Sequence, residues 1–469
     1  MKKCIKYLAF ILVLLIGTLL IGCGKESTIE ETTPIRKYDG SEVTVVFCHA
    51  LKPHLSDVID RYIVEFNKLY PNIHIDSQKS STDMDLYERL RRDTIRPNIV
   101  YSYPEYATIY NNSEFASFDD LIKSSKSDGN GGIIGLTQDQ IDDFVPGFYE
   151  EGTAYDNELM YTMPFCKSTE VLYYNKTFFE TNKLSVPTTW DEMEALCARI
   201  KELDPDCIPL GYDSSSNWFI TMCEQYMASG AKTAYTSASK EHCLFDTDVN
   251  KEFVKKFKSW FDKGYVVTHE IYVGYTSGLF VNTNQGELKC YMNIDSSTRA
   301  NNNCPTKVNN RYPFEVGIAT IPQVNPSSPK VIFQGPSVFI YKKSDPQEIA
   351  ATWLFVKYLT TSTEFQAEYA LASGGGYVPA LKSVMENESF ANMLNQADGG
   401  DNTSALSTKI CMEQADAYFF TPAFGGCEYV KKQVGYIIDR ALVSDGSDAT
   451  IQEIFKAVIE DCRHNISWQ

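Results

Sequence analysis

The chain has 469 residues, of which 61 are acidic and 43 basic, and its formal net charge is −18. A charge of this sign disfavours nucleic acid as a partner and disfavours adsorption to an anionic membrane face. Hydrophobic residues make up 43% of the chain, which is enough for packed cores, and a single core rarely grows to this chain length. The composition therefore predicts a globular protein with two lobes.

The N-terminus has the features of a processing signal. Three lysines precede a mostly apolar run over residues 7–20, which is shorter than a comfortable membrane span. The run ends in Leu20-Ile21-Gly22-Cys23, which resembles the bacterial lipobox, where the cysteine is lipidated. We therefore expect residues 1–22 to be a lipoprotein signal peptide. Cys23 would then carry the lipid that anchors the chain outside the cell, at the bacterial cell membrane.

Residues 24–37 are rich in Glu, Thr and Ser and almost free of apolar side chains. Such a segment buries too little surface to offset the entropy lost on ordering. We expect residues 23–40 to form the lipidated N-terminus and a flexible tether. A second long apolar stretch is missing from the sequence, which disfavours a channel or a permease.

The sequence contains thirteen cysteines and no C-x-x-C pair, which disfavours a zinc knuckle and a thioredoxin-type site. Cys4 lies in the signal and Cys23 is the expected lipid site, so an odd number remains. Several of these lie in apolar or helical surroundings. We interpret most of them as free, buried, small side chains and leave the disulfide state open. We expect neither a metal nor a cofactor.

The tethered part begins with alternating strands and helices. A β-branched run over 42–48 predicts a buried strand, and apolar residues at helical spacing over 56–70 predict a helix capped by Ser56. A second strand is expected at 73–76, a helix at 84–92 and a third strand at 98–103. This order predicts a parallel sheet with right-handed crossovers.

The rest of the chain continues in the α/β manner. An extended segment is expected at 161–174, and residues 387–404 are expected to form a polar loop. The remaining expected helices are 190–203, 251–263, 346–359, 428–443 and 450–462, and the remaining expected strands are 290–294, 315–321 and 338–341.

The longest motif is Met163-Pro-Phe-Cys-Lys-Ser-Thr-Glu-Val-Leu-Tyr-Tyr-Asn-Lys176, and Val186-Pro-Thr-Thr-Trp-Asp-Glu192 follows it. The shorter motifs are Phe66-Asn-Lys-Leu-Tyr-Pro-Asn-Ile73, Arg96-Pro-Asn-Ile-Val100 and Gly376-Tyr-Val-Pro379. In this order they resemble family 1 extracellular solute-binding proteins over about residues 41–465. The resemblance implies an α/β fold of the periplasmic-binding-protein type, with two lobes joined by hinge-crossing strands in the type II arrangement.

The resemblance also implies lobe boundaries and a function. Lobe one would comprise residues 41–165 and 320–375, and lobe two would comprise residues 166–319 and 376–469. The chain would be the substrate-binding lipoprotein of an ABC importer. It would capture a carbohydrate-type solute between its lobes and deliver it, as a monomer without enzymatic activity, to the transmembrane subunits of a permease.

Three alternatives stay open. Cys290-Tyr-Met-Asn-Ile-Asp-Ser-Ser297 resembles a loop of glycerol-3-phosphate-binding members, but their late arginine has no counterpart near Phe424 to Gln433. A receptor for glycerol 3-phosphate or a related polyol phosphate is therefore the second candidate. A sugar-active enzyme needs two convergent carboxylates, and the usual hydrolase and P-loop motifs are missing from the sequence. A sensory or adhesion lipoprotein without a permease is the third.

The candidate ligand-binding residues follow expected strands, because open α/β sheets bind ligands at the carboxyl ends of their strands. Carboxylates and short hydroxyls hydrogen-bond to sugar hydroxyls, an indole ring stacks on a sugar face, and glycine permits close approach of the backbone. The candidates are Glu105, Ser168, Thr169, Trp218, Asp295, Ser296, Ser297, Gly335, Ser337 and Tyr377.

Overall fold

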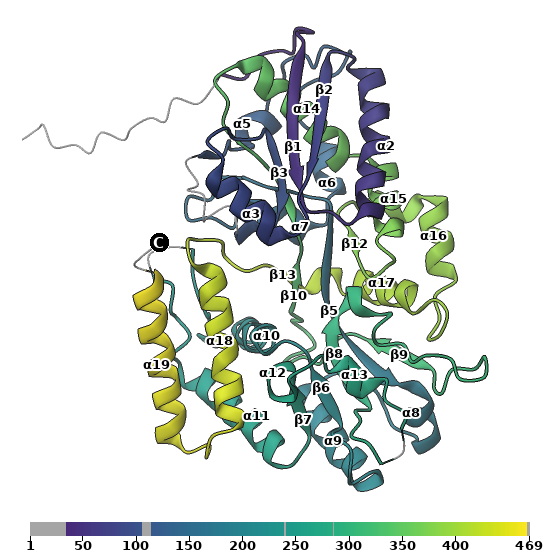
Figure 1. Ribbon diagram of the computed structural model, residues 1–469. Coiled ribbons are helices and arrows are strands. Elements are labelled where there is room, and N and C mark those ends of the chain that lie inside the picture. Colours follow the sequence, from purple (N-terminus) through teal and green to yellow (C-terminus); the bar gives the residue numbers. More distant parts are fainter. Residues whose placement is uncertain (1–33, 106–113, 239–240, 285, 467–469) are drawn as a thin grey trace, which may run out of the picture. The chain divides into compact units, whose positions relative to one another are not determined.

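The computed structural model describes residues 34–105, 114–238, 241–284 and 286–466 (Figure 1). Residues Ile35–Gln469 form one compact unit. Among the described helices, none combines the length and the apolar character needed to cross a membrane. The expected signal peptide, the lipid site at Cys23 and most of the tether lie outside the described residues.

The first of two sheets, sheet one, has the strand order β2-β1-β3-β11-β4. The first three strands are parallel to one another, as the β–α–β pattern predicts, and the last two are antiparallel to their neighbours. The strands are β1 (Val43–His49), β2 (Ile73–Lys79), β3 (Ile99–Ser102), β4 (Met163–Pro164) and β11 (Ser337–Ile340).

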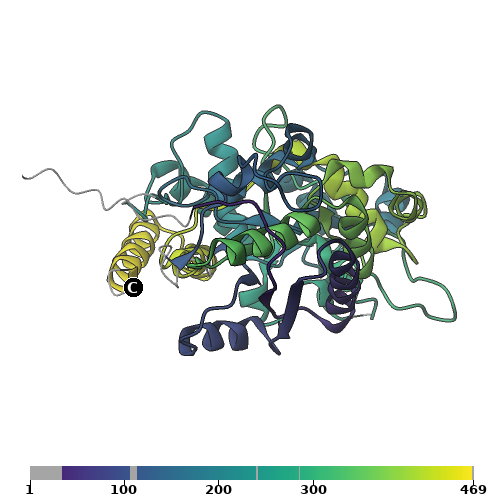
Figure 2. The same cartoon turned by 90° about the horizontal axis from the view of Figure 1, so that it is seen from above.

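Helices cover both faces of sheet one, and we call this assembly lobe one. The β1 side chains alternate, so Phe47 packs on Phe355 of α14 (Pro346–Thr360), while Cys48 joins the apolar cluster of α3 (Asp83–Arg92). Seen from above, α14 and α3 lie on opposite sides of the strands (Figure 2). Helices α2 (Pro53–Leu69) and α15 (Thr363–Ala372) complete the layer on the α14 side.

Sheet two has the strand order β13-β10-β5-β8-β6-β7, and β9 and β12 also pair with β5. The long strand β5 (Cys166–Asn175) is its centre. Its other strands are β6 (Leu210–Tyr212), β7 (Val266–Thr268), β8 (Met292–Ser296), β9 (Val316–Ala319), β10 (Val331–Gln334), β12 (Val378–Pro379) and β13 (Tyr418–Phe419).

Long helices pack around sheet two, and we call this assembly lobe two. In Figure 1, α18 and α19 lie side by side at one flank of lobe two. The longer helices are α9 (Trp190–Leu203), α10 (Ser215–Ala228), α11 (Asp248–Asp262), α18 (Cys427–Leu442) and α19 (Asp448–Ile466). The shorter ones elsewhere in the chain are α5 (Asp119–Ile122), α6 (Gln138–Asp143), α7 (Pro146–Glu150), α8 (Lys176–Asn182), α12 (His269–Tyr272), α13 (Ser277–Phe280), α16 (Glu388–Asn395) and α17 (Thr403–Glu413).

The chain passes between the two sheets from β4 to β5 and from β10 to β11, and β12 pairs with the first residues of β5. The two-sheet α/β architecture predicted from the sequence is therefore present. The lobe boundaries given above stay a prediction.

Two local expectations were wrong. Helix α2 begins at Pro53 rather than after Ser56, because proline is pre-organised for the first helical turn. Residues 387–404 are not a loop but contain α16 and the start of α17. The Asn387 side chain accepts a hydrogen bond from the backbone N–H of Phe390, and the buried Phe390 ring anchors this short amphipathic helix.

Candidate functional site

The carboxyl edge of sheet one lies where the chain crosses between the lobes. Strands β1 and β3 are parallel, so His49 and Ser102 end at the same edge. Strand β11 is antiparallel to β3 and β4, which places Ser337 opposite both Ser102 and Pro164. Pro164 ends β4, just before the chain enters β5.

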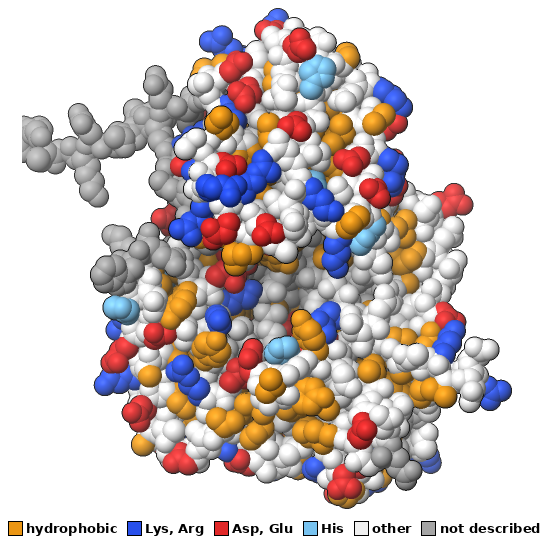
Figure 3. Space-filling model, viewed as in Figure 1, with side chains coloured by type: hydrophobic (Ala, Val, Ile, Leu, Met, Phe, Trp, Pro, Cys, Tyr) orange, Lys and Arg blue, Asp and Glu red, His pale blue; other side chains and the backbone are white. Residues whose placement is uncertain are grey.

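The carboxyl edge of sheet two meets the same crossing. Strand β8 is antiparallel to β5, so Ser296 lies opposite Glu170, near the start of β5. Strands β6 and β7 run parallel to β8, so Asp213 and His269, which follow them, lie on that edge too. Open α/β sheets bind their ligands at such edges. The space-filling view shows a hollow between the two lobes (Figure 3).

A cavity of about 200 Å³ opens at the carboxyl edge of sheet one. Four tyrosines line it: Tyr101, Tyr103, Tyr369 and Tyr377. Its polar lining includes Lys52, His54, Asp83 and Ser373. Tyrosine rings pack against the C–H faces of sugars, and the charged and hydroxyl groups supply hydrogen bonds to sugar hydroxyls.

Two of these tyrosines form the floor of the cavity. The hydroxyl of Tyr369 donates to the hydroxyl of Tyr101 over 3.2 Å, and the Tyr101 ring stacks on Phe165 at 4.8 Å. Burial raises the pKa of Tyr101, Tyr369 and Tyr377 above the ordinary tyrosine value. The floor is therefore uncharged at neutral pH.

Gly335 and Ser337 belong to a buried ion-pair network at the crossing. The Lys167 ammonium is completely buried and donates to the Glu151 carboxylate, to the carbonyl of Gly335 (2.7 Å) and to Oγ of Ser337 (2.8 Å). Ser337 in turn donates to Glu151 over 3.1 Å. Gly335 has φ +149°, and a Cβ there would lie 3.2 Å from the Cys166 carbonyl oxygen. In this conformation Gly335 and Ser337 hydrogen-bond to the buried ion pair and stabilise the segment that connects the lobes.

The three hydroxyl candidates near the start of β5 also contact backbone. Thr169 donates to the carbonyl of Ile332 (2.7 Å), and Ser168 donates to that of Gln334 (3.2 Å). Ser297 donates to the carbonyl of Gly376 (2.5 Å) and accepts from the backbone N–H of Thr169 (3.1 Å). They tie β5 to β10 and to the segment before β12.

Trp218 lies inside lobe two rather than at the cleft. It is 0% exposed, and its ring lies 4.9 Å from that of Tyr212 and 3.9 Å from that of Phe257. Its half-buried neighbour Asn217 accepts a hydrogen bond from Gln334 over 3.0 Å. Asn217 therefore reaches the crossing from α10 at the point where Trp218 was expected.

Asp295 and Ser296 end β8 at the carboxyl edge. Asp295 is buried and accepts from Nε of Arg299 (3.0 Å) and from Nδ2 of Asn303 (2.9 Å). Burial, with the nearby Asp213 carboxylate, raises the pKa of Asp295 to about 6. The hydroxyl of Ser296 hydrogen-bonds to that of Thr298. Asp295 thus holds Arg299 at this edge.

Glu105 bridges the two lobes through a carboxyl pair. It follows β3 in lobe one, and its side chain hydrogen-bonds to that of Glu428 in the first turn of α18. Burial raises the pKa of Glu428 to about 8. Burial also acts to raise the pKa of Glu105, but the hydrogen bond to Glu428 and the nearby Lys431 outweigh it, so the pKa of Glu105 is lowered. The two carboxyls share one proton at neutral pH.

This pair makes the stability of the protein depend on pH. Because the pKa of Glu428 is raised in the folded protein, its contribution is complete below the ordinary value of about 4.3. It is lost as the pH rises towards about 8. We expect the melting temperature of the Glu428→Gln variant to change less with pH over this range than that of the unchanged chain. Thermal melts at constant ionic strength measure this. Glu453→Gln, on the exposed face of α19, is the matched control, and equal slopes for both variants would contradict this expectation.

Of the predicted residues, the structure brings only Tyr377 to the lining of the cavity at sheet one. The other cavity residues were missed. Tyr103 is the last residue of the strand expected at 98–103, so the rule that led to Glu105 also pointed to it. Asp83 directly precedes the helix expected at 84–92 and had no such signal. Tyr369 lies inside α15 and had no such signal.

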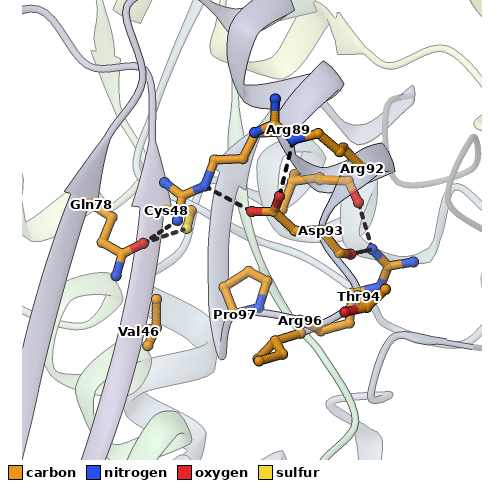
Figure 4. Close-up of a pocket in the computed structure, with 11 residues that line it drawn as sticks. Val46, Cys48, Gln78, Arg89, Arg92, Asp93, Thr94, Arg96 and Pro97 are labelled. Carbon is orange, nitrogen blue, oxygen red and sulfur yellow. Dashed lines mark hydrogen bonds and ion pairs between the residues drawn. The ribbon is translucent and has the colours of Figure 1, made fainter.

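Larger cavities lie elsewhere. One of about 460 Å³ lies beneath the end of α3, beside the amino end of β3. There the Asp93 carboxylate bridges Arg89 and Arg92 (Figure 4), and Arg96 pairs with Glu114. Another of about 320 Å³ lies at the amino end of β8. The arginines of the first cavity are paired within the chain, and the second cavity lies at the amino end of β8, so we place the site at the crossing. Within the described residues we find no cluster of histidine, cysteine and acidic side chains suited to a metal ion.

The chain resembles known proteins in sequence and in fold. Residues 61–395 match the model of a family described as bacterial extracellular solute-binding protein. An ABC transporter extracellular-binding protein of Pyrococcus horikoshii is 24% identical over 263 residues, which span 54% of this chain and 58% of that relative.

Solved structures share the fold at low identity. The cyclic α-maltosyl-1,6-maltose-binding protein of Arthrobacter globiformis has a TM-score of 0.66 at 18% identity, covering 90% of this chain and 100% of that one. The sugar-binding protein MalE of Xanthomonas citri has a TM-score of 0.65 at 18% identity, covering 90% and 98%. UgpB of Mycobacterium tuberculosis, solved with glycerophosphocholine, has a TM-score of 0.64 at 16% identity, covering 91% and 99%.

Proposed function

Because the chain belongs to the bacterial extracellular solute-binding protein family, we propose that it captures a carbohydrate-type solute between its lobes for delivery to an ABC importer. The cavity at the carboxyl edge of sheet one carries this proposal. Four tyrosines, two of which form an uncharged floor, lie beside Asp83 and His54 and combine aromatic faces with hydrogen-bonding groups. A sugar presents both kinds of surface.

Transport without chemistry fits this arrangement. A solute that contacts both carboxyl edges binds the closed form better than the open form, so binding shifts the population towards closure. The closed form would then dock on the transmembrane subunits of a permease as a monomer. Lipid at Cys23 would keep the protein near that permease. The family and the structures with the same fold are binding proteins, which supports a role without catalysis.

A polyol phosphate is the second candidate. Lys52 and His54 line the same cavity and would favour a phosphate group. A similar structure, UgpB, was solved with glycerophosphocholine. The tyrosines would also suit a quaternary ammonium group, since cations bind over aromatic faces.

Binding of sugars should depend on Tyr377. We expect Tyr377→Ala to weaken saccharide binding by about tenfold, because it removes one aromatic wall of the cavity. Isothermal titration calorimetry with mono- and oligosaccharides, glycerol 3-phosphate and glycerophosphocholine measures this. Tyr149→Ala is the matched control, because Tyr149 is a half-buried tyrosine of lobe one outside the cavity. Binding of the phosphate compounds alone would replace the sugar proposal with the polyol phosphate one.

A further inference from the structure

An exposed aromatic side chain lies at the carboxyl edge of sheet two. Tyr275 follows α12, which comes directly after β7 at that edge, and is 56% exposed. The guanidinium of Arg299 lies over its ring, 3.6 Å from the centroid. The ring of His269 packs against it at 4.9 Å in an edge arrangement.

Arg299 holds the Tyr275 ring in place. Its Nε donates to the buried Asp295 carboxylate (3.0 Å), and its Nη2 donates to Oγ of Ser277 (3.2 Å). A guanidinium carries five N–H groups, so several remain for another acceptor. One face of the tyrosine ring is covered by a fixed cation, and its exposed surface is left for a ligand.

The Asp213 carboxylate contacts the residue that follows Tyr275, and its side chain is 14% exposed. Oδ1 of Asp213 accepts from the backbone N–H of Thr276 (3.1 Å) and from its hydroxyl (3.3 Å). Its Oδ2 makes no hydrogen bond to any part of the chain that the structure describes. Asp213 and Asp295 together outweigh the charge of Arg299, so the cluster disfavours an anionic ligand.

The loop that carries Tyr275 has a strained backbone. Val273 has φ +58°, in the left-handed region that β-branched residues rarely adopt, and it is 89% exposed. Its backbone N–H bonds to the carbonyl of His269 and closes α12. Strain of this kind occurs at ligand-binding loops, where surrounding structure maintains it.

We propose that Tyr275, Asp213 and Arg299 form a subsite in lobe two for one pyranose ring of an uncharged saccharide. The C–H face of the ring packs on Tyr275. Its hydroxyls donate to Oδ2 of Asp213 and accept from the free N–H groups of Arg299. The subsite rests on the proposed function, because it supplies the lobe-two wall of the same cleft.

The test compares three variants by isothermal titration calorimetry with linear α-1,4 and β-1,4 glucose oligosaccharides of two to five rings. We expect Tyr275→Ala to weaken binding about tenfold and Tyr275→Phe to stay within about twofold, because the phenylalanine retains the ring. Tyr272→Ala is the matched control, since Tyr272 is an exposed tyrosine at the end of α12, three residues away, and the Arg299 guanidinium lies over Tyr275 instead. It should bind like the unchanged chain, and thermal melts check that all variants fold.

The outcomes separate the subsite from the function. Saccharide binding that is unchanged in Tyr275→Ala would overturn the subsite and leave the proposed function standing. An equal loss in Tyr275→Ala and Tyr272→Ala would also overturn it, because the effect would then belong to the loop as a whole. If the unchanged chain bound none of these saccharides, the subsite would be withdrawn with the sugar proposal.

Discussion

The Lys167→Met variant is expected to unfold more easily than the unchanged protein by about 3–5 kcal/mol. Lys167 is completely buried where the chain crosses between lobes, and its ammonium is the partner of the Glu151 carboxylate. Methionine preserves the volume but leaves that carboxylate buried without a counter-charge. It also removes the donor to Gly335 and Ser337. Urea unfolding followed by circular dichroism measures the change.

Two further variants distinguish the buried charge from general damage. Lys176 pairs with Glu315 at the surface, so Lys176→Met should cost about 1 kcal/mol or less. Adding Glu151→Leu to Lys167→Met removes the orphaned carboxylate and should recover much of the loss. A cost for Lys167→Met as small as that of Lys176→Met would show that water reaches the crossing and solvates Glu151.

The Trp218→Ala variant is expected to lose about 3–5 kcal/mol of stability while retaining saccharide affinity in the folded fraction. The indole is fully buried between Tyr212 and Phe257, so alanine leaves a cavity in lobe two. Chemical unfolding gives the stability, and calorimetry well below the melting temperature gives the affinity. Trp218→Phe should lose less, because it fills more of the cavity. Lost affinity with unchanged stability would instead support the stacking role expected from the sequence.

Local patterns were sufficient for most of the fold. Apolar spacing and β-branched runs predicted α2, β1 and β2, and the hinge motif predicted the extended course of β5. The order of motifs predicted the family, and the match over residues 61–395 confirms it. α16 was missed because its apolar stripe is short and its start depends on the Asn387 cap. A weak periodic signal in a polar segment is difficult to distinguish from a loop.

The site was predicted less well than the fold. Strand ends predicted Asp295 and Glu105, and the structure places both at the carboxyl ends of β8 and β3. Tyr377 lies just before β12, and the binding roles of all three stay a prediction. Strand ends could not show which of two adjacent side chains faces the crossing. The sequence therefore predicted Trp218, whereas Asn217 is the residue that reaches the crossing. Arg299 and Tyr275 are not part of any sequence motif, because they contact each other only after separate segments of the chain fold together.

By itself the sequence determined the family, the α/β class and the expectation of an N-terminal anchor, since each depends on residues adjacent in the chain or at a regular spacing. Only the tertiary structure decided which polar groups hydrogen-bond within the protein and which face the cleft. Tyr369 and Tyr101 meet across 268 positions of sequence, and Lys167 meets Ser337 across 170. Such contacts follow from how the sheets and helices pack, and no local periodicity records them.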